Sequence, residues 1–175
     1  MTPVESRRIL QHPDWHDASI LPSPAVRAWL LHEGSLTRKL QQHCTRLDVA
    51  IAHEGWTDDD HWLREVWLSG DGIPWIYAQT RIPRATLSHA AAPLQNSGNR
   101  PIGLWLYAQQ PTRLSLRWRY DSTSNSYARQ TVLALNGYPL DIREHFLPGF
   151  PYPEDWVVTA DPVSTSLGGS SIYAA

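Results

Sequence analysis

The stretch from residue 61 to residue 87 places one arginine inside an otherwise apolar strand pattern. Side chains of an extended chain alternate between two faces, so Arg64 shares its face with Trp62, Val66 and Leu68. These neighbours are typical of a protein core, where an unpaired charge is strongly destabilising. Arg64 therefore needs an anion, which is either a carboxylate of the protein or a carboxylate of a ligand that enters from outside.

Two hairpins are predicted by their turn residues. Gly-Asp-Gly at residues 70–72 separates two aromatic-rich runs, so the strand that contains Arg64 is expected to return over residues 75–82. Asn136 and Gly137 form a second hairpin signal, between strands expected at residues 129–135 and 140–147.

The strand expected at residues 140–147 contains a second anomaly. Glu144 shares a face with Ile142 and Phe146, so a carboxylate is expected to point inward. The simplest structural interpretation is a buried ion pair between Arg64 and Glu144, and the alternative is that both residues face a ligand.

The rest of the chain predicts a mixture of helices and strands. Helices are expected over residues 23–43, with a break at Gly34, and over residues 101–109, and a strand is expected over residues 46–54. Residues 114–120 alternate, which predicts Leu114, Leu116, Trp118 and Tyr120 inside and Arg117 and Arg119 on an exposed face. Residues 1–22 lack a clear period and are expected to form an irregular arm.

Composition excludes several classes of protein. A chain of 175 residues with a formal net charge of -2 fits one domain and gives no electrostatic signal for nucleic acid. No apolar run is long enough to span a membrane, and the start lacks a signal-peptide pattern. A single cysteine, Cys44, excludes an intramolecular disulfide and favours a reducing cytoplasm. We expect a cytoplasmic protein, most simply a monomer.

Motifs for cofactors are absent from the sequence. His53, Glu54 and His61 superficially resemble a metal cluster, but a strand and an acidic loop separate them. Neither GxGxxG nor GxxxxGK[ST] occurs, so a nucleotide site is not supported. We expect neither a metal nor an organic cofactor.

Four segments in fixed order resemble the chorismate pyruvate-lyase family: WLLHEGSLTRKLQQ (29–42), WLREVWLSGDGIPWIYAQTRIPRATL (62–87), PIGLWLY (101–107) and LNGYPLDIREHFLP (135–148). The similarity runs from about residue 25 to 150, which implies a domain over residues 1–150 and a tail over 151–175. It implies an α+β fold with an antiparallel sheet of about six strands, helices packed on one side and an enclosed ligand cavity. The implied activity is cofactor-free conversion of chorismate to 4-hydroxybenzoate and pyruvate, at the start of ubiquinone ring synthesis.

The resemblance also assigns roles to residues. The carboxylate-binding arginine of the family falls on Arg64, and the glutamate that binds the ligand hydroxyl falls on Glu144; these two are the implied catalytic residues. Backbone contacts to the ligand fall on Leu36 and Ile102. A further arginine of the family is replaced by Gln79, and Arg81 lies two residues on, so either is a candidate contact. The alternative function is a non-catalytic sensor of aromatic acids, since effector domains of transcription factors have a similar sheet.

Overall fold

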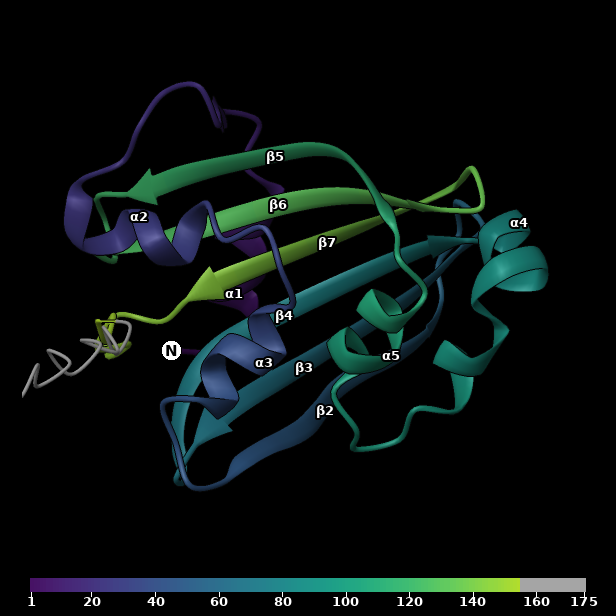
Figure 1. Cartoon of the computed structure of the whole chain (residues 1–175), viewed down its shortest axis with the longest axis horizontal. Helices are drawn as coiled ribbons and strands as arrows, with labels where there is room; N and C mark the ends of the chain where they lie inside the picture. The colour runs from purple at the N-terminus through teal and green to yellow at the C-terminus, as the bar shows by residue number, and fades with distance from the viewer. Residues whose placement is uncertain (155–175) are drawn as a thin grey trace, which may run out of the picture.

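The computed structural model describes residues 1–154, and nearly all of the predicted tail lies outside this range. Its centre is one antiparallel sheet of seven strands in the order β1-β5-β6-β7-β4-β3-β2 (Figure 1). The expectation of about six strands is thus exceeded by the two-residue β1. The strands are β1 (His16–Asp17), β2 (Leu47–Trp56), β3 (His61–Gly70), β4 (Ile73–Pro83), β5 (Thr112–Asp121), β6 (Ser126–Leu135) and β7 (Tyr138–Phe146).

Helices cover both faces of this sheet. In Figure 1, α2 (Pro24–Leu30), α3 (Leu36–Gln41) and α5 (Ile102–Ala108) lie in front of the strands, as the resemblance implied, and α1 (Pro3–Gln11) lies behind them. Short helical turns follow β4 at the edge of the molecule: α4 (Arg84–Thr86), the π-helical η1 (Leu87–Ala91) and the 3₁₀-helical η2 (Ala92–Asn96). No helix within residues 1–154 is long and apolar enough to cross a membrane.

Both predicted hairpins are confirmed. Asp71 and Gly72 have φ angles of 50° and 82°, and Asn136 and Gly137 have φ angles of 50° and 86°. Two consecutive left-handed residues are what a two-residue turn needs to match the twist of its strands. The turns fix the register of β3 with β4 and of β6 with β7, and this register determines which side chains share a face.

The core on the α2, α3 and α5 face consists of two apolar clusters. One contains Trp29, Leu40 and Phe146, and the other contains Leu94, Leu106 and Leu133. Burial of these side chains supplies the main driving force for packing the helices on the sheet. Polar side chains between the two clusters are therefore surrounded by packed apolar groups.

Helix α1 was missed in the sequence. Residues 1–22 were expected to be irregular, but Pro3–Gln11 is helical and begins with a capping box. The Glu5 amide donates to Thr2 Oγ1 at 3.3 Å, and the Thr2 amide donates to the Glu5 carboxylate at 2.6 Å. Starts of the form Thr-Pro-x-Glu favour a helix because they satisfy backbone donors that lack helical partners. The prediction of an irregular arm was therefore wrong over residues 3–11.

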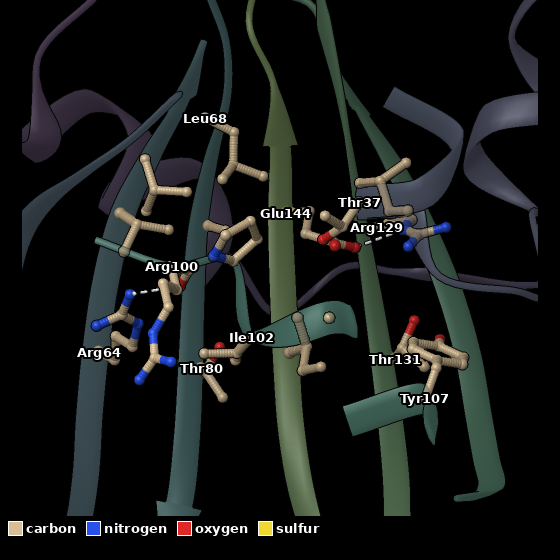
Figure 2. Close-up of a pocket in the computed structure, with 17 residues that line it drawn as sticks. Thr37, Arg64, Leu68, Thr80, Arg100, Ile102, Tyr107, Arg129, Thr131 and Glu144 are labelled. Atoms are coloured by element: carbon tan, nitrogen blue, oxygen red, sulfur yellow. Dashed lines mark hydrogen bonds and ion pairs between the residues drawn. The ribbon is translucent and has the colours of Figure 1, made fainter. Parts of the chain in front are cut away.

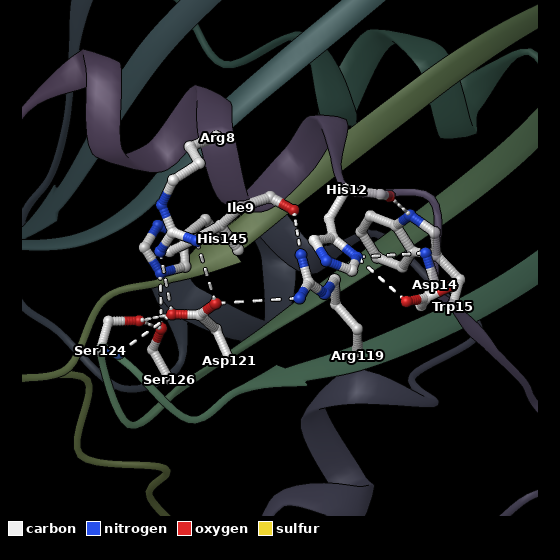
Figure 3. Close-up of polar contacts among 10 residues, drawn as sticks. All are labelled: Arg8, Ile9, His12, Asp14, Trp15, Arg119, Asp121, Ser124, Ser126 and His145. Atoms are coloured by element: carbon white, nitrogen blue, oxygen red, sulfur yellow. Dashed lines mark hydrogen bonds and ion pairs between the residues drawn. The ribbon is translucent and has the colours of Figure 1, made fainter.

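A buried polar network joins α1 to the back of the sheet (Figure 3). The His145 ring lies between two hydroxyls, with Nδ1 at 3.0 Å from Ser6 Oγ and Nε2 at 2.8 Å from Ser126 Oγ. Asp121 accepts a hydrogen bond from Ser124 Oγ at 2.7 Å, and Arg8 of α1 pairs with the same carboxylate at 3.2 Å. Burial lowers the pKa of His145 to about 4, so this ring is neutral at physiological pH.

The position of α1 also explains an error in the interpretation of β5. Arg119 was expected on an exposed face, but it is buried, and its Nη1 donates to the Ile9 carbonyl of α1 at 2.7 Å. Leu114 was expected inside, but the register of β5 shifts between Arg113 and Ser115, and Leu114 is 57% exposed. Tyr120 is likewise exposed, while Trp118 is buried and Arg117 is exposed as predicted.

Candidate functional site

A pocket lies between the sheet and the segments that cover its front face (Figure 2). Its floor is formed by side chains from β2, β3, β4, β7 and β6, and its cover by the starts of α3 and α5 and the loop before α5. Apolar lining residues belong to both core clusters, so the pocket lies where the clusters meet. The polar lining residues are Thr37, Arg64, Thr80, Arg100, Tyr107, Arg129, Thr131 and Glu144.

Arg64 faces this pocket and is 2% exposed. Its Nη1 donates to Glu54 Oε1 at 2.8 Å, and its Nη2 donates to the carbonyls of Gly98 at 2.7 Å and Arg100 at 3.3 Å. The anion that Arg64 requires is therefore supplied in part by the protein. A guanidinium has five N–H donors, and Nε–H and one Nη1–H have no acceptor within residues 1–154. These two donors point from different edges of the guanidinium, so each can donate to a ligand oxygen but they cannot bind one carboxylate together.

Glu54 was considered in the sequence only as a metal ligand, and its contact with Arg64 was missed. Simple alternation from Val49 and Ile51 places Glu54 on the opposite face of β2. The register of β2 with β3 shifts between Ile51 and His53, and this bulge turns Glu54 to the pocket face, directly opposite Arg64. No sequence signal marked the bulge.

Glu144 also faces the pocket, but it does not pair with Arg64. Its Oε2 accepts a hydrogen bond from Nε of Arg129, the residue directly opposite on β6. Nη1 of Arg129 donates to the carbonyls of Trp29 and His32, each at 3.2 Å. The interpretation that Arg64 and Glu144 form one buried ion pair was therefore wrong, because each has a different partner on a neighbouring strand.

Arg129 is the functional candidate that sequence reasoning missed. It was taken as the first residue of a strand over 129–135, where a charged residue is unremarkable. The strand in fact begins at Ser126, so Arg129 lies inside it and is 2% exposed. The useful signal was its alternation with Thr131 and Leu133, which places the guanidinium on the inward face.

Leu36 and Ile102 both line the pocket, each as the first residue of a helix. Amides in the first turn of a helix have no acceptor within the helix, so they are available to other groups. The two helices approach closely here: a Cβ added at Gly103 would lie 2.5 Å from Thr37 Oγ1. The absence of a side chain at Gly103 thus allows both helix starts to lie over the same part of the sheet.

Gln79 and Arg81 point away from the pocket, because alternation along β4 turns Ala78 and Thr80 toward it. Gln79 Nε2 donates to Glu65 Oε1 at 2.6 Å, and Arg7 of α1 binds the same carboxylate. Arg81 pairs with Asp59 near the end of the strand. The idea that either residue contacts the substrate is therefore corrected: both lie on the other face of the sheet.

The suspected metal ligands have other partners. Glu54 binds Arg64, and the His61 ring contacts the Asp59 carbonyl at 2.8 Å. Over residues 1–154, no group of three or more histidine, cysteine, aspartate or glutamate side chains is arranged to hold a metal ion.

Comparisons with known proteins find relatives over most of this chain. A family model described as chorismate lyase matches residues 9–152. A chorismate pyruvate-lyase from Pectobacterium atrosepticum is 35% identical over 150 residues, which cover 76% of this chain and 82% of the relative. A probable chorismate pyruvate-lyase from Bartonella bacilliformis is 37% identical over 149 residues, which cover 75% and 85%.

Among solved structures, a GntR-family transcriptional regulator from Bacillus cereus aligns with 66% of this chain and 100% of its own, at 14% identity and a TM-score of 0.42. That score is too low to support an inference about function. The family match extends further toward the N-terminus than the four segments identified in the sequence, and it includes every polar residue of the pocket. The chain belongs to the chorismate lyase family.

Proposed function

We propose that this protein is a lyase that converts chorismate to 4-hydroxybenzoate and pyruvate, the reaction that supplies the ring of ubiquinone. The observation that carries the proposal is that, in a chain of this family, a buried arginine and a buried glutamate lie on the same wall of one pocket. Arg64 and Glu144 lie on strands separated only by β4. This spacing suits a six-membered ring that carries a carboxylate at one end and a hydroxyl at the other.

In this proposal Arg64 binds the ring carboxylate. One of its two remaining N–H donors supplies a charge-assisted hydrogen bond, and Glu54 with the carbonyls of Gly98 and Arg100 fixes the orientation of the guanidinium. The amides of Leu36 and Ile102 provide further donors from the covering helices. Because the protein contacts exist before the ligand arrives, little rearrangement of Arg64 is needed on binding.

Glu144 binds the hydroxyl at C4 of the substrate. The reaction breaks the C4–H bond, and the electron pair forms the C3–C4 double bond that completes the aromatic ring. The C3–O bond breaks at the same time, and its electron pair leaves with the ether oxygen as enolpyruvate. Enolpyruvate takes up one proton to give pyruvate, which balances the proton released from C4. Formation of the aromatic ring supplies the driving force, so the protein contributes mainly position and charge stabilisation.

The chemistry balances without an oxidant, a reductant or a metal, so we propose that the enzyme needs no cofactor. We also propose that it acts as a monomer in the cytoplasm. The sequence composition, with a single cysteine, suits a reducing compartment.

The test is direct. Purified protein is mixed with chorismate, and 4-hydroxybenzoate is followed by ultraviolet absorbance while pyruvate is measured with a coupled assay. Stoichiometric release of both products is expected. A preparation of Arg64→Ala made in the same host controls for contaminating host lyase. Binding of 4-hydroxybenzoate without turnover of chorismate would refute the enzyme assignment and favour the sensor.

A further inference from the structure

The substrate of the proposed reaction carries a second negative charge, and its binding partner follows from where that charge must lie. Chorismate bears one carboxylate on the ring and another on the enolpyruvyl ether at C3. C3 is bonded to C4, the carbon whose hydroxyl we assign to Glu144. The second carboxylate therefore lies at the Glu144 end of the pocket. This inference rests on the proposed function and names the part of the site that recognises the leaving group.

Three arginines line the pocket, and only one of them is at that end. Figure 2 shows Arg64 and Arg100 together on one side and Arg129 on the other, next to Glu144. Arg100 directs its guanidinium to the carbonyls of its own loop, Ser97 and Asn96, each at 3.2 Å. Arg129 is thus the pocket cation placed to meet a carboxylate attached beside the C4 hydroxyl.

The contacts of Arg129 leave donors for such a ligand. Nε is used by Glu144, and Nη1 is used by the carbonyls of Trp29 and His32. Nη2 has no acceptor within residues 1–154, so both of its N–H groups remain available to a ligand. The carbonyl contacts hold the guanidinium plane fixed, which allows recognition without loss of further side-chain entropy.

We propose that Arg129 binds the carboxylate of the enolpyruvyl group through Nη2 and compensates the negative charge of enolpyruvate as it leaves. When the C3–O bond breaks, the ether oxygen receives the electron pair, and the departing group then carries both a carboxylate and an enolate charge until it takes up a proton. A fixed cation beside it stabilises this charge in a site that excludes water. Gln79, which was considered above as a substrate contact, cannot bind this carboxylate because its side chain donates to Glu65 on the other face of the sheet.

Two stable ligands test the role of Arg129 separately from the roles of Arg64 and Glu144. One is 3-carboxymethoxy-4-hydroxybenzoate, which carries a second carboxylate where chorismate carries its enolpyruvyl group. The other is 3-methoxy-4-hydroxybenzoate, which has the same ether without the charge. Both share the ring carboxylate for Arg64 and the hydroxyl for Glu144, so the ratio of their dissociation constants reports only the second carboxylate. Titration calorimetry at one ionic strength measures both.

Wild-type protein is expected to prefer the carboxymethoxy ligand by about tenfold or more, and Arg129→Met is expected to abolish the preference. That variant leaves Glu144 buried without its partner, so the comparison is repeated in Arg129→Met/Glu144→Gln, with Glu144→Gln as its reference. Arg100→Met is the matched control and should keep the preference. Chorismate turnover should show a raised KM and a lowered kcat in Arg129→Met, while 3-methoxy-4-hydroxybenzoate still binds.

Several results would overturn the proposal. It fails if wild-type protein does not distinguish the two ligands, or if either Arg129→Met protein keeps the wild-type preference. It also fails if Arg100→Met abolishes the preference, because the second carboxylate would then lie at the Arg64 end. Failure of the proposed function looks different: wild-type protein would not convert chorismate, whether or not it binds 4-hydroxybenzoate.

Discussion

Replacement of Arg64 by alanine should reduce affinity for 4-hydroxybenzoate more than it reduces stability. The ligand carboxylate loses a charge-assisted hydrogen bond to a buried, fixed guanidinium, and such a loss costs roughly 2–5 kcal/mol. This corresponds to a dissociation constant raised about 30- to 5000-fold. Titration calorimetry with 4-hydroxybenzoate measures this change directly.

The expected loss of stability is smaller. Glu54 loses its partner in Arg64→Ala, but 22% of its side chain is exposed, so water can solvate it once the guanidinium is gone. We therefore expect a loss of about 1–3 kcal/mol in the free energy of unfolding, below the range for a fully buried pair. Urea denaturation without ligand measures it.

Two further variants sharpen the test. Arg64→Lys supplies three donors from one nitrogen, and three protein acceptors already surround that position, so it should restore stability better than affinity. Arg81→Ala removes an arginine on the other face of the sheet that pairs with Asp59 in the turn between β2 and β3, and it should bind 4-hydroxybenzoate normally. Near-normal affinity in a folded Arg64→Ala protein would refute the reasoning and leave Arg64 a purely structural residue.

Three other outcomes are expected. Glu144→Gln should keep the fold and some product binding but lower chorismate turnover roughly 100-fold or more if the carboxylate takes part in proton transfer; wild-type turnover would remove it from the mechanism. The pKa of His145 is about 4 in the folded protein and 6.5 without burial, so stability should fall by about 2 kcal/mol between pH 6.5 and pH 5, where only the unfolded chain binds the proton. His145→Gln should flatten this dependence in thermal melts, and an unchanged slope would contradict it. Dialysis against EDTA should leave turnover intact, and activity restored by zinc or magnesium would contradict the cofactor-free proposal.

Local patterns in the sequence were sufficient to identify two polar residues of the pocket floor, Arg64 and Glu144. Alternation in a strand depends only on backbone geometry, so Arg64 and Glu144 were identified as inward-facing from their apolar neighbours. The two hairpins followed from turn residues that tolerate a left-handed backbone. These features involve residues close in sequence, where the local chemistry determines the structure.

The partners of these residues could not be predicted in the same way. Glu54 contacts Arg64 because of a bulge, and Arg129 contacts Glu144 because β6 begins three residues earlier than its apolar pattern suggests. Both depend on pairing between strands, which a single strand does not encode. Helix α1 was missed for another reason: its capping box is a short local signal, but it was overlooked among the prolines and histidines that surround it.

Arg64 and Arg129 share a feature that links binding to the segments around the pocket. Arg64 donates to the carbonyls of Gly98 and Arg100, in the loop before α5, and Arg129 donates to those of Trp29 and His32, in the segment that leads from the end of α2 to the start of α3. Each guanidinium therefore holds one of these segments with some of its donors. Loss of Arg64 removes a contact to 4-hydroxybenzoate and also frees the loop before α5, whereas loss of Arg129 acts on this ligand only by freeing the segment before α3. Ligand dissociation should consequently accelerate more than association slows in both Arg64 and Arg129 variants, which stopped-flow measurements of 4-hydroxybenzoate binding can resolve. A change confined to the association rate would show that the arginines act only by attracting the anion from solution.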